Sequence, residues 1–223
     1  MPTRAAVKAL PVVGPLATRL RAAARRRSFR GSASYWEQHY SAGGSSGEGS
    51  YGELASFKAE VLNAFVADNQ VTSVLELGCG DGHQLSLARY PTYVGLDVAA
   101  TAIDLCTRRF AEDTTKSFFW YDPARFVNNG ALSAELAMSL DVIYHLIEDE
   151  VFDRYMRQLF AAATRFVAIY SSDLDEGDSH AHVRHRPFST WVAAHQPEWR
   201  LLHTVDNPIE HRPTAARFFF YGR

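Results

Sequence analysis

The stretch Val74-Leu75-Glu76-Leu77-Gly78-Cys79-Gly80-Asp81-Gly82 decides how this chain folds. Its first residues predict a buried strand, which breaks into a glycine-rich turn and then enters a helix. A glycine turn at a strand end lets the backbone approach a ligand closely. A second apolar run, Tyr93-Val94-Gly95-Leu96, ends in Asp97. An acidic side chain there can accept hydrogen bonds from a ribose diol, so the two strands together predict a nucleoside-containing cofactor.

The spacing of the glycines narrows the choice of cofactor. Dinucleotide-binding proteins use G-x-G-x-x-G, which seats a pyrophosphate on a helix N-terminus. Here the spacing is G-x-G-x-G and it follows Glu76, whose charge would repel a pyrophosphate and would suit an ammonium group. An ordinary strand–turn–helix joint explains one or two glycines, but not three glycines with both carboxylates.

These residues resemble the first motif of the class I S-adenosylmethionine (SAM) methyltransferases, which is commonly E/D-x-G-x-G-x-G. The resemblance covers roughly residue 51 to the C-terminus. It implies an α/β fold, a Rossmann-like sheet of seven strands with the last one antiparallel and helices on both faces. It also implies SAM as the cofactor and methyl transfer as the reaction.

The pattern after residue 70 alternates between strand and helix, as that fold requires. Strands are expected at 72–77, 92–97, 117–121, 135–140, 165–171, 199–205 and 216–222, and helices at 51–69, 83–89, 99–111, 149–163 and 189–195. Such alternation predicts a parallel sheet covered on both faces. The last two strands predict a hairpin, because no helix-length connection separates them. Residues 71–223 are therefore expected to form the SAM-binding core.

The composition is that of an ordinary globular chain. It has 223 residues, of which 47% are hydrophobic and 22% charged, which suits one domain with some decoration. The two cysteines, Cys79 and Cys106, provide neither a disulfide framework nor a C-x-x-C metal site. No apolar run approaches the ~18 residues that a membrane span needs. We therefore expect a protein of the reducing cytoplasm.

The net charge of −2 conceals a basic N-terminal arm at residues 1–30. This arm holds eight Arg and Lys residues and no acidic one, so the rest of the chain has 15 basic and 25 acidic residues, a balance of −10. Pro11 and Pro15 interrupt any long helix, and the short apolar run at 9–17 is not a convincing signal peptide. The arm is either a tail or a helix packed on the domain, or it makes weak contact with an anionic membrane surface or polyanion.

Residues 31–70 are expected to form a lid segment and the first helix. The aromatic-rich piece at 35–40 precedes a flexible Gly/Ser loop at 41–50. Apolar residues then recur at helical spacing over 51–69. The segment is either a linker and a core helix, or a lid whose aromatic side chains cover the cofactor and acceptor. The resemblance supports the lid.

Ligands in open α/β sheets bind outside the carboxyl ends of the strands, so the residues that follow each strand are the candidates. The resemblance implies that the glycine turn contacts the methionine part of SAM, that Asp97 binds the ribose and that Val98 packs on the adenine. It also implies that Asp122 binds the adenine amino group, although a turn cap before Pro123 is the alternative. The full expected cofactor set is Glu76, Gly78, Cys79, Gly80, Gly82, Asp97, Val98, Tyr121, Asp122 and Ser139.

The segment 138–149, after the fourth strand, carries the expected catalytic groups, because the family usually places them there beside the cofactor sulfur. Asp141 and His145 are four residues apart, so on a helical turn they share one face. A carboxylate can orient an imidazole and raise its basicity. The pair can then deprotonate a hydroxyl acceptor. A helix cap for Asp141 and simple packing for His145 are the alternatives.

The loop after the fifth strand is dense in polar side chains, with Asp173 followed by the His- and Arg-rich stretch 179–186. Tyr144, Asp173, His182, Arg184 and His185 are expected to face a hydroxyl-rich or anionic acceptor, and a solvated polar loop is the alternative. Asp141 and Asp173 can also hold Mg²⁺, which would polarise an acceptor hydroxyl, although no spacing is diagnostic of a metal. A structural zinc site is disfavoured, since thiolates are absent there.

Methyl transfer to a hydroxyl is favoured over transfer to an amine. The N/D-P-P-Y/F tetrapeptide of adenine-N6 and glutamine methyltransferases is absent after the fourth strand. Residues 140–146 instead resemble bacterial small-molecule and sugar O-methyltransferases, including the methylmannose-polysaccharide type. Because a sugar hydroxyl is a poor nucleophile until its proton leaves, a base beside the methyl group is expected.

Three other functions fit parts of the sequence. A nucleic-acid methyltransferase would grip phosphates with the basic arm, but the −10 balance of the remainder opposes stable nucleic-acid binding. A non-catalytic SAM-binding protein would tolerate alanine at Asp141 and His145. An NAD(P) dehydrogenase is disfavoured by the glycine spacing. A homodimer is compatible with the sequence.

Overall fold

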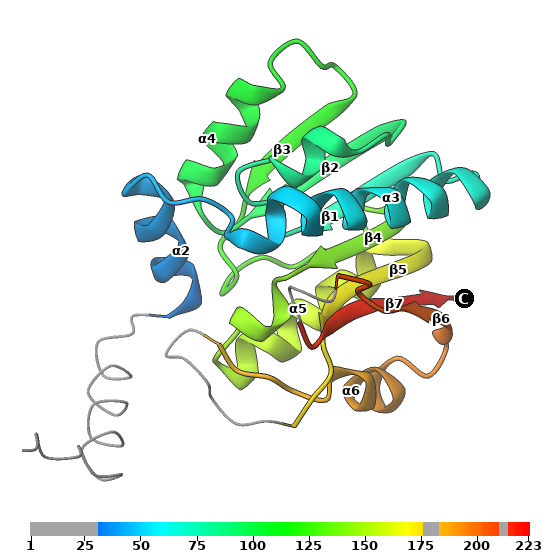
Figure 1. Cartoon of the computed structure of the whole chain (residues 1–223). Helices are drawn as coiled ribbons and strands as arrows, with labels where there is room; N and C mark the ends of the chain where they lie inside the picture. Colours follow the sequence, from blue (N-terminus) through cyan, green and yellow to red (C-terminus); the bar gives the residue numbers. More distant parts are fainter. Residues whose placement is uncertain (1–30, 176–182, 210–213) are drawn as a thin grey trace, which may run out of the picture.

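The computed structural model describes residues 31–175, 183–209 and 214–223, and a seven-stranded sheet lies at its centre (Figure 1). The order of the strands in the sheet is β3-β2-β1-β4-β5-β7-β6. The strands are β1 (Ser73–Leu77), β2 (Thr92–Asp97), β3 (Lys116–Trp120), β4 (Ala134–Leu140), β5 (Ala163–Ser172), β6 (Arg200–Val205) and β7 (Ala216–Gly222). The pairs among β1–β5 are parallel, and β7 runs antiparallel to both neighbours, as expected. The order of the strands reverses between β1 and β4, where such sheets bind ligands.

Helices cover both faces of the sheet, and this explains the apolar runs of the central strands. On β4, Leu136 and Met138 face one core with Leu62 of the helix Gly52–Asp68, whereas Ala137 faces the other core with Met156 of the helix Asp149–Ala162. The helices are α2 (Ser32–Ser41), α3 (Gly52–Asp68), α4 (Ala100–Arg109), α5 (Asp149–Ala162) and α6 (Phe188–His195). The alternation along β4 follows directly from the two-residue period of a strand.

Helix α2 lies beside α4, beyond the carboxyl ends of the parallel strands (Figure 1). Its Glu37 accepts hydrogen bonds from the Thr101 backbone N–H (3.2 Å) and hydroxyl (2.6 Å). A carboxylate at this point satisfies a free amide in the first turn of α4. The aromatic-rich segment is therefore fixed over the edge of the sheet at which a ligand would bind.

One expected element differs from the structure. The helix expected at 83–89 is only a short 3₁₀ helix, η2 (Gln84–Leu87). Gly82 precedes it with φ +74°, and Pro91 disfavours a helical conformation at Tyr90. Among the described residues, none of the helices combines the length and hydropathy that crossing a bilayer would require. The basic arm at 1–30 lies outside the described residues.

Candidate active site

A cavity of about 370 Å³ opens at the carboxyl ends of β1, β2 and β4. Such a volume falls within the range of small-molecule sites. Its walls come from α2, the loop at 45–50, the glycine turn, the ends of β2 and β3, the segment at 140–146 and one side of α5. The cavity therefore lies at the switch point of the sheet, with the 31–50 segment forming one wall.

The glycine turn needs its glycines for two separate reasons. Gly78 and Gly80 line the cavity with φ of +86° and +58°. A Cβ on Gly78 would lie 2.5 Å from Val142 Cγ2, and one on Gly80 would collide with Ser46 Oγ. Gly82 lies outside the cavity wall, and its Cβ would meet Cys106 Sγ at 3.0 Å. Two glycines thus admit close neighbours at the cavity, and the third allows the turn to pack on α4.

Two buried carboxylates, Glu76 and Asp97, face the cavity. Glu76 accepts a hydrogen bond from the Tyr93 hydroxyl (2.6 Å), and Asp97 accepts from the backbone N–H groups of Gly80 and Ala99, both at 2.9 Å. Burial raises the pKa of Glu76 to about 7 and that of Asp97 to about 6. Within the part of the chain that the structure describes, neither carboxylate forms an ion pair, so both can accept a cation or hydroxyl donors from a ligand.

The other expected cofactor residues divide into two groups. Cys79, Val98 and Tyr121 line the cavity, but Asp122 and Ser139 do not. Asp122 accepts a hydrogen bond from the Ala124 N–H (2.9 Å), which is the turn-cap alternative. Ser139 is buried behind the wall, where it shares a hydrogen bond with the Tyr155 hydroxyl (2.7 Å).

Residues 45–51, here called the strap, cross the glycine turn through contacts with Asp81. The Asp81 carboxylate accepts from the Ser46 N–H (3.0 Å) and the Tyr51 hydroxyl (2.7 Å), and the Asp81 N–H donates to Ser46 Oγ (2.9 Å). The Tyr51 ring also stacks on His83, with centroids 4.0 Å apart. The strap is thus held directly against the turn that would contact a cofactor.

Asp141 and His145 both line the cavity, but not on one helical face. Asp141 has φ +59°, and only a short 3₁₀ turn, η3 (Ile143–His145), follows it. The left-handed residue breaks the helical register that the four-residue spacing assumes. The Asp141 carboxylate instead accepts from Lys58 Nζ (2.6 Å) and from the Tyr144 hydroxyl (2.8 Å).

The rings of Trp36, Tyr144 and His145 form an aromatic wall at this end of the cavity. The centroids of His145 and Trp36 are 5.0 Å apart, and those of His145 and Tyr144 are 4.6 Å apart. Burial and the neighbouring Asp141 carboxylate raise the pKa of Tyr144 well above its usual value. The phenol of Tyr144 therefore stays protonated and acts as a hydrogen-bond donor.

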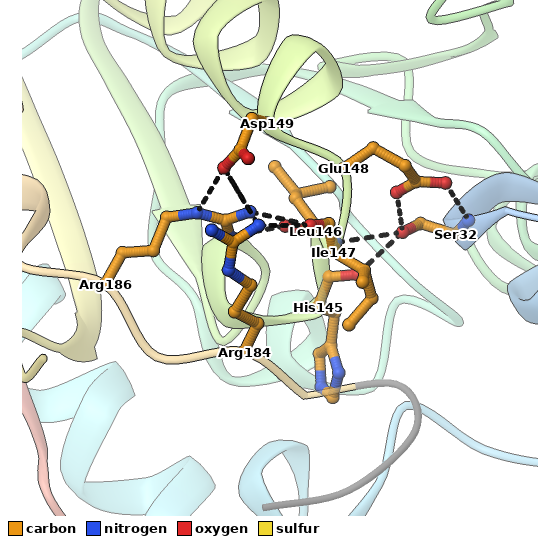
Figure 2. A network of polar contacts seen from close by, with 8 residues as sticks. All are labelled: Ser32, His145, Leu146, Ile147, Glu148, Asp149, Arg184 and Arg186. Carbon is orange, nitrogen blue, oxygen red and sulfur yellow. Dashed lines mark hydrogen bonds and ion pairs between the residues drawn. The ribbon is translucent and has the colours of Figure 1, made fainter. Parts of the chain in front are cut away.

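Figure 2 shows how the backbone around His145 is held from two sides. On one side, Ser32 of α2 donates from its hydroxyl to the His145 carbonyl (2.8 Å) and to Glu148 (2.9 Å). On the other side, Arg186 donates to the carbonyl oxygens of Leu146 (2.5 Å) and Ile147 (2.7 Å). The turn that carries His145 thus has little freedom to shift.

Three of the residues expected to contact the acceptor, Asp173, Arg184 and His185, lie outside the cavity wall, as does the neighbouring Arg186. Arg184 and Arg186 both pair with Asp149, Arg184 at 2.9 Å and Arg186 at 3.2 Å (Figure 2). His185 shares a hydrogen bond of 2.6 Å with the Ser172 hydroxyl. Tyr144 is the member of this set that reaches the cavity, and His182 lies outside the described residues.

The expected metal ligands Asp141 and Asp173 have separate partners. Asp173 accepts from the Ser189 N–H (3.0 Å) and hydroxyl (2.6 Å) at the start of α6, whereas Asp141 pairs with Lys58. Among residues 31–175, 183–209 and 214–223, no group of three or more His, Cys, Asp or Glu side chains could hold a metal ion.

Sequence reasoning missed Lys58, Asp81 and Tyr155. A signal for Lys58 exists, because it lies four residues after Leu54 and four before Leu62, within the apolar stripe of α3. A charged residue in such a stripe needs a buried partner. Asp81 and Tyr155 carry no comparable local signal.

The sequence matches no protein-family model and no curated protein. Solved structures nevertheless align with most of the chain. The N-methyltransferase NodS from Bradyrhizobium japonicum WM9, in complex with S-adenosyl-L-homocysteine (SAH), has a TM-score of 0.64 and 14% identity, covering 86% of this chain and 98% of NodS. The fold is that of the class I SAM-dependent methyltransferases.

Two further proteins with this fold are named for chemically different acceptors. Magnesium protoporphyrin IX methyltransferase (ChlM) from Synechocystis PCC 6803, with bound SAH, has a TM-score of 0.60 and 14% identity over 75% of this chain and 83% of ChlM. The mitomycin 7-O-methyltransferase MmcR has a TM-score of 0.55 and 16% identity over 77% of this chain and 55% of MmcR. At such identities the likeness concerns the fold alone, so the acceptor must be argued from the site.

Proposed function

We propose that the protein is a SAM-dependent O-methyltransferase whose acceptor is a small hydroxyl compound, with sugars and oligosaccharides as the first candidates. The observation that carries this proposal is the pair of buried carboxylates beside the glycine turn. Glu76 suits the ammonium group of SAM, and Asp97 suits its ribose hydroxyls. The raised pKa of each carboxylate is what a buried anion without an ion-pair partner shows before a ligand supplies compensation.

When bound, SAM supplies an electrophilic methyl group on a sulfonium. The chain's own task is to hold donor and acceptor in line, and such alignment supplies much of the acceleration. The glycine turn and Asp97 would fix the cofactor end, and the strap would exclude water above the turn. Tyr121 and Val98 provide an apolar surface for the adenine.

The aromatic wall of Trp36, Tyr144 and His145 would hold the acceptor. The negative faces of these rings attract the C–H faces of a ring-shaped acceptor. The Tyr144 hydroxyl donates its proton to Asp141, and its oxygen can accept a hydrogen bond from a hydroxyl of the acceptor. The carboxylate beside this wall, Asp141, is already neutralised by Lys58. This balance favours a neutral hydroxyl compound over a cationic amine.

His145 is the general base of the proposed reaction. An imidazole takes up a proton near neutral pH and can receive the hydroxyl proton as the methyl group transfers. Asp141 already accepts hydrogen bonds from Lys58 and Tyr144. Its role is therefore to orient the Tyr144 ring beside His145, and not to remove the proton.

A titration with SAM and SAH, followed by a screen with labelled SAM, tests the proposal. The acceptors are methyl and p-nitrophenyl glycosides, phenols and amines, each with Mg²⁺ and with EDTA. We expect SAM binding and transfer to a hydroxyl. The variant His145→Gln should lose about 10²–10⁴-fold in rate while its affinity for SAM stays unchanged. Transfer to amines alone, or no SAM binding, would overturn the proposal.

A further inference from the structure

Lys58 is a fully buried cation beside the cavity, and none of the steps above uses it directly. Its side chain is 0% exposed, and its Nζ lies 2.6 Å from Asp141 Oδ2 and 5.4 Å from the centroid of the Tyr170 ring. The charged end of this side chain therefore extends from α3 to Asp141, the residue that follows β4. A buried charge is costly even when it is paired, because both charges must be removed from water. A buried lysine at this position therefore calls for an explanation.

The partner of Lys58 occupies an unusual backbone position. Asp141 has φ +59°, in the left-handed region that residues other than glycine rarely adopt. Its N–H donates to the Tyr170 carbonyl (2.9 Å), and its carboxylate bridges Lys58 and the Tyr144 hydroxyl. Such strained positions persist only where several contacts determine them, and they cluster at functional sites.

The contacts continue from Asp141 to the aromatic wall. Asp141 Oδ1 accepts from the Tyr144 hydroxyl at 2.8 Å, and the Tyr144 ring packs edge-on against His145. Lys58 thus reaches the wall through one carboxylate and one phenol, although Lys58 itself does not line the cavity. The two oxygens of the Asp141 carboxylate thus join Lys58 to the Tyr144 hydroxyl, Oδ2 on one side and Oδ1 on the other.

We propose that Lys58 is a positioning residue for methyl transfer, which acts through Asp141 and Tyr144 to fix the aromatic wall that holds the acceptor. This inference rests on the proposed function. It predicts that Lys58 matters for the transfer step and not for SAM affinity. It also predicts that Lys58 and Tyr144 act as one unit.

A double-mutant cycle on the full chain measures this coupling. The variants are Lys58→Met, Tyr144→Phe and both together, assayed by single-turnover transfer from saturating SAM to the best glycoside of the screen, well below each variant's Tm. Each single variant should lower the rate about 10–100-fold, and the double variant should be no slower than the slower single variant. The Kd for SAM should stay within about twofold of the wild-type value.

The matched control is Lys116→Met. Lys116 also pairs with an aspartate, Asp113, and lies over an aromatic ring, that of Phe110, but it is outside the cavity. The rate of methyl transfer by Lys116→Met should remain that of the wild type. If Lys58→Met does not fold, Asp141→Asn replaces it in the cycle, because asparagine has the same size and tolerates φ +59°.

Two failures can be told apart. The role of Lys58 would be rejected if the fold losses in rate of the two single variants multiplied in the double variant, or if each loss in rate merely matched a loss in Tm. Methyl transfer by the wild-type protein would still uphold the proposed function. A wild-type protein that binds no SAM or transfers no methyl group would reject the proposed function itself.

Discussion

Gly80 shows how a single residue shapes the cavity. With φ +58° it approaches Ser46 and Tyr40 so closely that a methyl group has no room. Gly80→Ala should weaken SAM binding by about tenfold or more, because the turn or the strap must move to accommodate the new Cβ. Calorimetric titration with SAM measures this effect.

Gly43→Ala is the matched control for that prediction. Gly43 also has positive φ, +84°, but a Cβ there would meet nothing within 4 Å. The control therefore carries the backbone strain without the collision, and its SAM affinity should stay close to that of the wild type. Equal losses in the two variants would show that strain, and not space, explains the effect.

Glu76 makes stability depend on pH. Burial raises its pKa to about 7 from an ordinary value of 4.5, so the folded protein holds this proton more tightly than the unfolded chain does. The resulting stabilisation is present below about pH 4.5 and is lost as pH rises through about 7. Glu76→Gln removes the titrating group, so its free energy of unfolding should fall less over this range. Asp97, whose pKa burial raises to about 6, leaves part of the slope in place.

Urea denaturation at several pH values checks this prediction. Glu60→Gln, at an exposed position of α3, should keep the slope of the wild type. A Glu76→Gln variant with an unchanged slope would contradict the assignment of this titration to Glu76.

At the residue scale, the sequence predicted those site residues that belong to a local motif or follow directly after a strand. The positions of Glu76, the first two motif glycines and Asp97 at the cavity follow from one motif and one strand end. The contact of Lys58 with Asp141 joins residues 83 positions apart, so only the folded chain creates it. The spacing of Asp141 and His145 misled because it assumes a helix, whereas the backbone at Asp141 is left-handed.

Helix α6 provides a prediction at the scale of one element. Asp173 binds the N–H and hydroxyl of Ser189 in its first turn, as a capping carboxylate does. Asp173→Ala should therefore cost about 1 kcal/mol of stability and leave the rate of methyl transfer unchanged. Thermal unfolding and the labelled-SAM assay together measure the two effects. A large loss of rate without a loss of stability would instead favour the acceptor-binding role expected from sequence.

Strands and long helices were predictable because their apolar periodicities are strong. The shortness of η2 was not predicted, because the residues between Gly82 and Pro91 have a helix-like pattern. These two flanking residues limit the length of the helix. Glycine and serine content likewise identified the loop that contains the strap. It did not reveal the docking of that loop on Asp81, because this depends on hydrogen bonds to a distant turn.

The molecule as a whole is stabilised by two apolar cores, one on each face of the sheet. Phe218 of β7 is fully buried among aromatic rings, including Tyr170 and Phe220. Phe218→Ala should cost about 3–5 kcal/mol, from lost burial and the cavity left behind. Phe119→Ala on the edge strand β3, where the side chain is 46% exposed, should cost far less. Urea denaturation compares the two, and similar losses would contradict this division between core and edge.

The antiparallel direction of β7 also determines how the protein can be handled. Since β7 starts opposite Ser172 and finishes opposite Phe166, the last residues emerge on the side of the sheet away from the cavity (Figure 1). Gly31, by contrast, lies next to Glu148, close to the turn that carries His145. An affinity tag or surface tether on Arg223 would therefore lie away from the cavity, whereas a bulky fusion joined at Gly31 would lie beside the turn that carries His145.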